Sequence, residues 1–297
     1  MKTKVSVSLV FLGWLLSVST FALDAGWVDH FEGKSDYYLI KRDNEIVSVN
    51  LFTVLQVGDK IVVNKQHKTI ILGLRGGTQF VQVTSENSPF KVSDKYQVPD
   101  ELETLWIWTR QYLHEWQKLT QLVVKLSENQ PIISTMPKKP ILPLLLNKEE
   151  SAALVAGQRS LYLQWYGGKP PYQVHIQQRR HIMFSKTSVL PTIQMDSLTF
   201  DANKSYSVKI VDVNGFVGRG GFKIADEMPF EPKTSEVNWP DNFRRTLQAT
   251  WLAKQENGKW MFEAYQQIAH LTDYQPAQLL KQALPYLQKL NSRGIRG

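Results

Sequence analysis

The sequence predicts a multidomain protein that is mainly β with additional helices. Two stretches, residues 23–98 and 148–235, carry short runs of β-branched and aromatic residues that are separated by turn residues. In residues 99–130 and 236–297, apolar residues instead recur at intervals of three and four, which is typical of amphipathic helices. The expected order is a small β domain, a long connecting helix, a β-sandwich and C-terminal helices.

Residues 1–22 have the pattern of a secretory signal peptide. Two lysines precede an apolar stretch over residues 5–18, and Thr20-Phe21-Ala22 offers a small-x-Ala cleavage site. The stretch is shorter than the roughly 20 residues that span a bilayer. We therefore expect cleavage between Ala22 and Leu23, and no transmembrane segment after signal removal. The expected location is the periplasm of a Gram-negative type of cell, peripheral to the envelope.

The first β domain, residues 23–98, is expected to contain strands at 38–40, 46–49, 60–63, 69–74 and 80–83. A corner follows from Leu55-Gln56-Val57-Gly58-Asp59-Lys60-Ile61, in which Gly58 permits a tight turn and Asp59 can bond its own backbone. This corner, followed by strands that end near Phe90-Lys91-Val92, resembles the FecR-type periplasmic domain. The resemblance implies an envelope-interaction module and supplies no catalytic residue.

Residues 99–130 predict a long amphipathic helix. Asp100 and, three residues later, Glu103 fit an N-cap with a capping-box partner. Thr109 interrupts an apolar seam that consists of Leu102, Leu105, Tyr112, Trp116, Leu119, Val123 and Leu126. We expect this seam to pack on a neighbouring domain and to fix the distance between the two β units. A homodimer through a coiled coil of residues 100–128 is the alternative.

Residues 131–147 are expected to form a linker, because four prolines fall within this segment. Proline removes backbone donors and blocks helix formation, which favours an extended chain. The apolar end of the segment, residues 141–146, is expected to lie along the following domain as a first strand.

In residues 148–235, apolar and polar residues alternate again, and this pattern predicts a β-sandwich. The signature segments are Leu161-Tyr162-Leu163-Gln164-Trp165, Gly167-Gly168 and Pro170-Pro171-Tyr172-Gln173-Val174. Together they resemble bacterial surface repeats of the immunoglobulin-like type, and that resemblance implies a domain that spaces or binds. Trp165 is expected to fill the core between the sheets, and Tyr172 is expected to pack its ring while its hydroxyl stays in water.

Residues 236–297 predict three helices, at 241–252, 260–271 and 276–290. Asp241 is expected to cap the first helix, and Asn257-Gly258 to break the chain before the second. Pro285 is expected to bend or delay the third helix. Each helix has one apolar face, so a small bundle or hairpin is expected.

The sequence carries no recognisable pattern for an enzyme, a metal or a cofactor. The chain has no cysteine, which excludes disulfides, thiol nucleophiles and zinc–thiolate sites. His114-Glu115 begins the H-E-x-x-H zinc motif, but Lys118 occupies the position of the second histidine. The glycine-rich segment 215–221 matches neither phosphate-binding pattern, and no G-x-S-x-G segment is present. We therefore expect no catalytic residue and no cofactor.

The net charge of +8 comes mainly from the C-terminal half, and such a surplus favours anionic partners through long-range attraction. A surface charge that serves solubility alone is the alternative, because no dense cluster of Lys and Arg is present. Residues 177–181 are the most basic short stretch, in which Arg179 and Arg180 are candidate partner-binding residues; a solvated hairpin end is the alternative. Trp165 and Tyr172 are further candidates. Nucleic acid is not expected as a partner, because the charge is diffuse and the chain carries an export signal.

The function that these features predict is a non-enzymatic periplasmic scaffold or adaptor that binds another cell-envelope protein. The alternative is a carbohydrate- or peptidoglycan-binding module. A shallow face of exposed aromatic rings would favour the glycan, whereas an exposed apolar patch would favour a protein partner.

Overall fold

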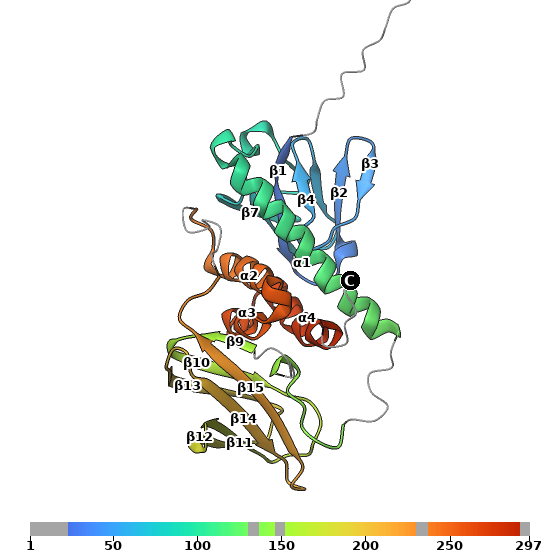
Figure 1. The fold of residues 1–297 in the computed structure, drawn as a ribbon. Helices are drawn as coiled ribbons and strands as arrows, with labels where there is room; N and C mark the ends of the chain where they lie inside the picture. The colour runs from blue at the N-terminus through green and yellow to red at the C-terminus, as the bar shows by residue number, and fades with distance from the viewer. Residues whose placement is uncertain (1–22, 130–136, 146–151, 230–236, 292–297) are drawn as a thin grey trace, which may run out of the picture.

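The computed structural model describes residues 23–129, 137–145, 152–229 and 237–291. Figure 1 shows three parts stacked along the molecule, with a β unit at one end, a layer of helices in the middle and a second β unit at the other end. The fold is therefore mainly β with helices and several sheets, as the sequence predicts. The expected signal peptide with Ala22 lies outside the described residues, and Leu23 is the first residue within them.

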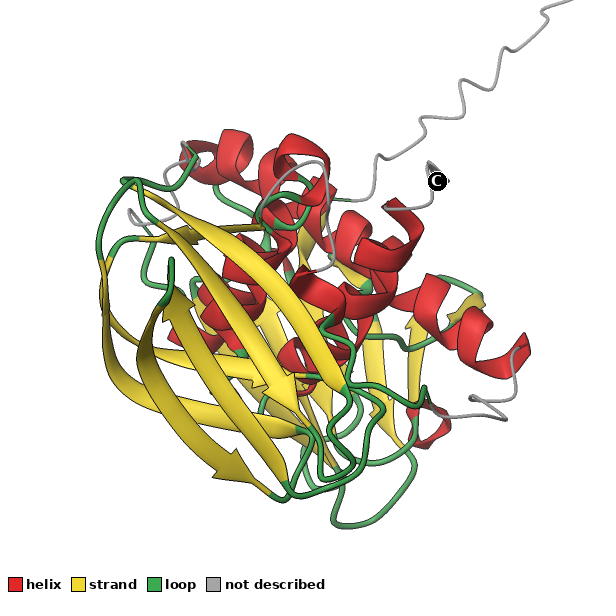
Figure 2. Cartoon of the chain, turned by 60° about the horizontal axis from the view of Figure 1, so that its bottom comes forward, coloured by secondary structure: helices red, strands yellow, loops and turns green. Residues whose placement is uncertain are grey.

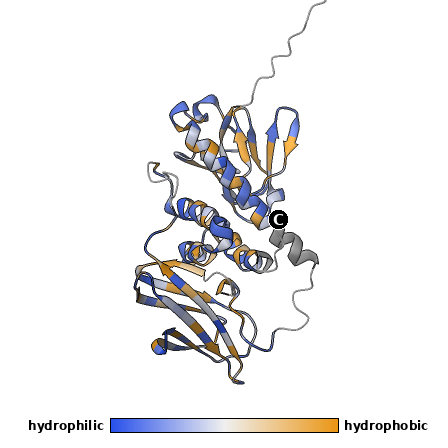
Figure 3. Ribbon diagram, in the orientation of Figure 1, coloured by the Kyte–Doolittle hydropathy of each residue, from blue (hydrophilic) through white to orange (hydrophobic). Residues whose placement is uncertain are grey.

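The N-terminal β unit contains two four-stranded sheets that share one core. Its strands are β1 (Asp24–Phe31), β2 (Tyr38–Arg42), β3 (Glu45–Val47), β4 (Val54–Gln56), β5 (Lys60–Val63), β6 (Thr69–Leu74), β7 (Gln79–Thr84) and β8 (Phe90–Lys91). The sheet orders are β4-β1-β6-β7 and β3-β2-β5-β8. Val28, Ile40 and Leu72 come from both sheets and are fully buried in the common core. Figure 3 shows the alternation of hydrophobic and hydrophilic residues along these strands.

Strand β1 was not among the predicted strands, although it lies in the interior of its sheet between β4 and β6. Its residues 25–29 are buried, with Val28 in the core of the β unit and Trp27 packed against the helices. A strand that is covered on both faces shows no polar alternation. Asp29 and Gly26 also lower its apparent β propensity. These features explain why the sequence pattern did not indicate a strand here.

The predicted corner lies between β4 and β5. Gly58 has a φ of +101°, a backbone conformation that suits glycine. The carboxylate of Asp59 is buried and accepts two hydrogen bonds from the Arg42 guanidinium, both at 2.9 Å, and one from the Gln56 amide at 2.9 Å. The hydrogen bond to Asp59 raises the pKa of Arg42. The corner is therefore held to strand β2 by a buried ion pair as well as by its own backbone.

Helix α1 (Glu103–Asn129) forms the predicted long helix and lies diagonally across the N-terminal β unit in Figure 1. The predicted capping box is wrong. Residues Asp100–Leu102 form a short 3-10 turn before α1, and this turn has Pro99 at its N-cap and no capping side chain. The chain thus enters the helix through a backbone bond from the Leu102 amide to the Pro99 carbonyl at 2.9 Å.

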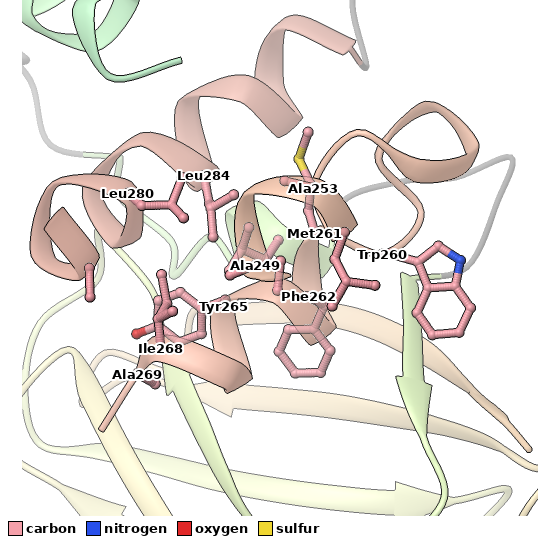
Figure 4. Close-up of a cluster of buried hydrophobic side chains, with 14 of the residues drawn as sticks. Ala249, Ala253, Trp260, Met261, Phe262, Tyr265, Ile268, Ala269, Leu280 and Leu284 are labelled. Atoms are coloured by element: carbon pink, nitrogen blue, oxygen red, sulfur yellow. The ribbon is translucent and has the colours of Figure 1, made fainter. Parts of the chain in front are cut away.

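The remaining helices pack beside α1 and complete the helical layer. They are α2 (Asp241–Leu252), a 3-10 turn at Gln255–Gly258, α3 (Met261–Ile268) and α4 (Gln275–Asn291). Helix α4 continues through Pro285, where the sequence led us to expect a bend or a delayed start. Figure 4 shows Phe262 and Tyr265 of α3 and Leu284 of α4 among the buried side chains of this layer, which extends to the strands of the second β unit.

An aromatic junction joins the helices to the N-terminal β unit. We use this name for Trp27, Phe52, Trp106, Trp116, Trp239 and Phe243, which are all buried. The ring of Trp27 stacks on Trp106 at 6.0 Å and on Phe243 at 4.5 Å, and Phe52 meets Trp116 edge-on at 4.7 Å. Gly77 makes this packing feasible, because a Cβ there would lie 2.2 Å from the Trp27 ring.

The aromatic junction also bears on the alternative of a homodimer through residues 100–128. Trp106, Leu113 and Trp116 of this segment are buried within the single chain, against β1, α2 and the start of α4. These three side chains therefore contact the same chain, whereas Leu105 and Leu119 of the seam are only partly buried and Ile107 is 55 % exposed. The homodimer stays a prediction. The expectation that the helix packs onto neighbouring parts of the same chain is confirmed.

A buried polar cluster adds to the junction where α4 approaches β1. The Asp29 carboxylate accepts hydrogen bonds from the Tyr274 hydroxyl at 2.8 Å and from the Trp27 indole at 3.2 Å, and it lies 2.8 Å from His30 Nδ1. Burial, and then the neighbouring Asp29, raise the pKa of Tyr274 well above its usual value. Tyr274 therefore remains a hydrogen-bond donor, and the cluster stabilises the contact between the two parts.

An ion pair between α1 and the turn after α2 predicts a weak dependence of stability on pH. Glu115 lies 2.8 Å from the ammonium of Lys254, and this hydrogen bond lowers the pKa of Glu115 from its usual value of 4.5. A lowered pKa in the folded state contributes stability above pH 4.5 that is lost as the pH falls further. We expect Glu115→Gln to cost less than about 1 kcal/mol at pH 7, because Lys254 is partly exposed.

The measurement is urea unfolding of Glu115→Gln and the original chain at pH 7 and pH 3. The difference in free energy of unfolding should be present at pH 7 and absent at pH 3. A difference of the same size at both pH values would show that the charge of Glu115 contributes nothing.

The second β unit is a two-sheet arrangement with a covered interior. Its strands are β9 (Ala152–Val155), β10 (Gly157–Gln164), β11 (Tyr172–Gln178), β12 (His181–Ser188), β13 (Thr192–Phe200), β14 (Ser205–Val211) and β15 (Val217–Ala225). The sheet orders are β10-β13 and β12-β11-β14-β15-β9, with β9 parallel to β15 and the other pairs antiparallel. Figure 2 turns these strands toward the viewer. Strands β9 and β13 were not predicted.

Part of the expected linker is packed against this unit. Within residues 137–145, Pro140 and residues 142–145 are buried, and Ile141 forms an isolated bridge with Tyr166. The apolar end lies along the following domain as expected, but Pro143–Leu145 form a 3-10 turn instead of a strand. Gly220 on β15 leaves room for it, because a Cβ there would lie 2.5 Å from Leu145. The rest of the expected linker lies outside the described residues.

No helix within the described ranges is both long enough and apolar enough to cross a membrane.

Candidate functional site

Helix α3 closes one side of the second β unit. Two backbone amides of β9 donate to groups of the helical layer: Ala153 donates to the Lys259 carbonyl at 2.9 Å, and Val155 donates to the Glu263 carboxylate at 3.0 Å. On β10, the side-chain amide of Gln266 pairs with both backbone groups of Tyr162, at 2.8 and 2.9 Å. The helix thus supplies hydrogen-bond partners to two strand edges, which protects them from pairing with another chain.

A buried ion pair anchors this closed side. The Glu263 carboxylate is fully buried and accepts two hydrogen bonds from the Arg159 guanidinium, at 2.8 and 3.0 Å. It also accepts one from Gln267 at 2.6 Å. Every oxygen of Glu263 is therefore bonded within the chain. The arrangement is that of a structural link between helix and sheet and leaves no group free to act on a substrate.

Strand β12 presents the opposite situation, because it is the outer strand of its sheet and pairs only with β11. Figure 1 places it on the side of the unit that faces away from the helices. Six of its eight residues are exposed. No backbone hydrogen bond to any other described segment is present along the free side of the strand. An unpaired backbone edge of this kind is a template on which another extended chain can pair.

Large apolar side chains gather on β12 and on the turn that follows it. Ile182 is 49 % exposed and Met183 is 42 % exposed, and the turn adds Val189 and Leu190 at 71 % and 62 %. Single exposed apolar residues are ordinary on protein surfaces, but four within nine residues form a local group. We call β12 with these two turn residues the open edge.

The sheet that carries the open edge contains no carboxylate. None of the five strands β9, β11, β12, β14 and β15 includes Asp or Glu. Pairing places His175, Lys209 and Arg219 side by side in one row across the outer face, with Lys209 directly opposite Arg219. Like charges in such positions are unfavourable unless anions are nearby. The exposed turn residues Arg179 and Arg180 add to this positive field.

The structure separates the four partner-binding candidates named from the sequence. Arg179 and Arg180 are exposed at the tip of the β11–β12 hairpin, beside the open edge. Trp165 and Tyr172 are 2 % and 4 % exposed, and their rings meet edge-on at 5.2 Å inside the unit. Trp165 fills the core as expected, so the prediction that it contacts a partner is corrected. Tyr172 is corrected too, because its hydroxyl is buried and faces the Gly167 carbonyl.

Two further kinds of site to consider in the described residues are a metal cluster and a surface depression. Among the described residues, no three His, Cys, Asp or Glu side chains come together in a way that could hold a metal ion. The two most evident surface depressions are open and shallow, and each lies on the N-terminal β unit. One of them is lined by Arg75, Thr78, Gln79, Pro99, Glu101 and Leu102. The other is lined by Glu32, Gln66, His67, Lys68, Thr69, Thr84, Ser85 and Glu86. Hydroxyl groups and possible bases line both depressions, but none of these lining residues has its hydroxyl hydrogen-bonded to a histidine or carboxylate of the same depression.

Comparisons with known proteins leave the family open. No family model matches the chain, and no curated protein matches it. Among solved structures, CopC from Methylosinus trichosporium OB3b matches at 15 % identity and a TM-score of 0.22, over 29 % of this chain and 97 % of its own. The superoxide reductase (neelaredoxin) from Ignicoccus hospitalis matches at 10 % identity and a TM-score of 0.22, over 33 % and 89 %. The N-terminal four Ig domains of Dscam1 isoform 8.4 match at 9 % identity and a TM-score of 0.21, over 68 % and 37 %. Similarities at these TM-scores carry no argument about the function of this chain.

Proposed function

We propose that this chain is an exported, non-enzymatic adaptor of the cell envelope that binds another protein through the open edge. The observation that carries the proposal is a strand of eight residues, β12, with one unpaired side and a group of exposed apolar residues on it and beside it. Sheet edges of this kind bind extended chains, since the backbone supplies affinity and alternate side chains supply specificity. The helical layer suits a scaffold, because it connects the two β units through buried contacts.

An immunoglobulin-like identity for the second β unit is part of the proposal. Its support is the strand order, in which β9 pairs in parallel with the last strand, β15. Tyr206 near the start of β14 adds support, because its hydroxyl accepts a hydrogen bond from the Asp201 amide at 3.2 Å, as in a tyrosine corner. A FecR-like identity for the N-terminal unit rests on the corner at Gly58 and Asp59. Export rests on residues 1–22.

A glycan-binding function is less well supported than protein binding. Its candidate rings, Trp165 and Tyr172, are buried. Among the described aromatic residues, Phe216 and Tyr286 have large exposed side chains, but one lies in the β14–β15 turn and the other on α4. Two rings in different parts of the molecule provide no common face on which a sugar could stack.

The test is photocrosslinking in intact cells, with a benzophenone amino acid at Ile182 on the open edge. The matched control carries the same group at Ile46 on strand β3, which is also an exposed isoleucine on an outer strand. We expect a discrete adduct with an envelope protein from position 182 and none from position 46. Mass spectrometry of the adduct identifies the partner, and the N-terminus of the captured chain should be Leu23.

Two results would contradict the proposal. One is the absence of any adduct at position 182. The other is the same adduct at both positions, which would show that the capture reflects exposure alone.

A further inference from the structure

We infer that the partner contributes an extended, acidic segment that pairs with β12 as an additional strand of the five-stranded sheet. The inference deepens the proposed function and rests on it. The proposed function requires only that a protein binds at the open edge. The inference states the backbone conformation and the charge of the part that binds.

The first argument is that the other outer strands are protected and β12 is not. Helix α3 supplies partners to β9 and β10 through Glu263 and Gln266. Strand β13 carries a register shift opposite residues 159–161, and Asp196 lies on it. In the N-terminal unit, outer strands β3 and β4 have three residues each and β8 has two. Outer strand β7 has six residues, and the Asn87 side chain accepts a hydrogen bond from its Thr84 amide at 2.7 Å and donates one to its Gln82 carbonyl at 3.0 Å. Short length, bulges, charges and covering elements are the usual protections of sheet edges.

The second argument concerns the fit of a peptide backbone. Strand β12 has eight residues, which is enough to pair with a segment of ordinary strand length. Phe184 pairs with Ile176 and points toward the half-buried side, whereas Ser185 pairs with His175 in the outer row. A segment paired with β12 would therefore add side chains to both faces of the sheet. Every second side chain would lie on the face of Phe184, and the side chains between them would lie on the face of Ser185 and His175.

The third argument selects the charge of the occupant. Basic residues lie along the edge, with Arg179 and Arg180 at one end of β12 and Lys186 near the other. No carboxylate lies on any strand of this sheet, and Asp196 of the other sheet is the acidic residue close enough to Lys186 to interact with it. A second copy of this chain would place the same basic edge against itself, and like charges that face each other across strands are destabilising. Carboxylates at alternate positions of a partner segment would instead meet positive charge. An acidic segment is therefore favoured over a second copy.

The experiment begins with the purified mature protein and a phage-displayed library of random ten-residue peptides. We expect the enriched peptides to carry net negative charge, to be rich in β-branched residues and to lack proline. Enrichment of neutral or basic peptides, or no enrichment above an uncoated surface, would overturn the inference. The inference would also be overturned if the mature protein formed a dimer at micromolar concentration and Lys186→Glu altered the dissociation constant of that dimer.

Backbone pairing is then tested on the best peptide by methylating its amide nitrogens one at a time. Only one side of an added strand faces β12, so methyl groups at every second residue should weaken binding at least tenfold. Methyl groups at the intervening residues should change it little. Losses without this period of two would show that side chains alone make the contact, and would overturn the inference while leaving partner binding at the open edge intact.

Charge is tested with a triple variant, Arg179→Glu, Arg180→Glu and Lys186→Glu. We expect it to bind the acidic peptide at least tenfold more weakly and to gain binding to the same peptide with Lys in place of its acidic residues. The matched control has the same change in net charge on exposed lysines of the N-terminal unit, Lys60→Glu, Lys65→Glu and Lys91→Glu. Equal loss in both triple variants would show that only overall charge matters. Failure of the proposed function itself is recognised separately, by the absence of a crosslinked partner at Ile182 in cells.

Discussion

We expect the substitution Trp116→Ala to lower the free energy of unfolding by about 3–5 kcal/mol. Trp116 is 3 % exposed in the aromatic junction, with its ring edge-on to Phe52 at 4.7 Å. Its indole nitrogen donates a hydrogen bond to the Pro276 carbonyl at 3.3 Å. The substitution removes a large side chain from between α1, α4 and the β unit, and it also removes the hydrogen bond that joins α1 to the start of α4. Both effects act in the same direction, so the loss should be at the upper end for a core position.

The control for this prediction is Thr109→Ala on the same helix. Thr109 is fully buried, but its hydroxyl bonds to the Leu105 carbonyl of its own helical turn at 2.8 Å. Its removal deletes one local hydrogen bond and a small volume, so we expect a loss of about 1 kcal/mol or less. Urea unfolding monitored by circular dichroism measures both variants. If Trp116→Ala unfolds at the same urea concentration as the original chain, the junction does not hold the parts together as described.

The elements that the sequence predicted well are those whose pattern is local. Helix α1 repeats its apolar positions every three or four residues, so its length and the burial of Trp116 follow from the sequence alone. The predicted seam was only partly right, because Leu105, Tyr112 and Leu119 are half-buried and the buried positions are Trp106, Thr109, Leu113, Trp116 and Thr120. The corner at Gly58 and Asp59 is equally local, because a positive φ and a side chain that bonds to the nearby backbone need no distant partner. The alternating strands of both β units belong to the same class.

The features that the sequence did not predict depend on distant neighbours. In strand β1, apolar and polar residues do not alternate, because helices cover the face of the strand that would otherwise meet solvent. Trp165 and Tyr172 illustrate the same difficulty. The alternation of apolar and polar residues does not reveal which face of a strand is covered. Both residues were therefore predicted to contact a partner, although they are buried. The open edge was also missed. His181-Ile182-Met183-Phe184 reads as an ordinary strand, and only the pairing order of the whole sheet places it on the outside.

A second large effect is expected at the link between α3 and the sheet edges, where Glu263→Ala should cost about 3–5 kcal/mol. Glu263 is fully buried, and it neutralises Arg159, whose side chain is 20 % exposed. Alanine at this position would leave the Arg159 guanidinium without its counter-charge in a largely buried site. It would also leave the Val155 amide on the edge of β9 without an acceptor. Removal of one member of a buried pair is costly for this reason, even where the complete pair adds little to stability.

Two further variants distinguish the loss of the buried ion pair from a general loss of packing. Glu256→Ala removes a carboxylate from an exposed pair with Lys259 in the same region and the acceptor of the Trp260 indole at 2.7 Å, and it should cost no more than about 2 kcal/mol. The double variant Glu263→Leu with Arg159→Met removes both charges and fills the space with apolar groups, so it should recover much of the stability that Glu263→Ala loses. Guanidinium unfolding of the four proteins provides the values. If the double variant is as unstable as Glu263→Ala, the hydrogen bond to the edge of β9 is the main contribution and the charge of Arg159 is not. If Glu263→Ala costs no more than Glu256→Ala, water reaches the pair and α3 does not close the edges of β9 and β10.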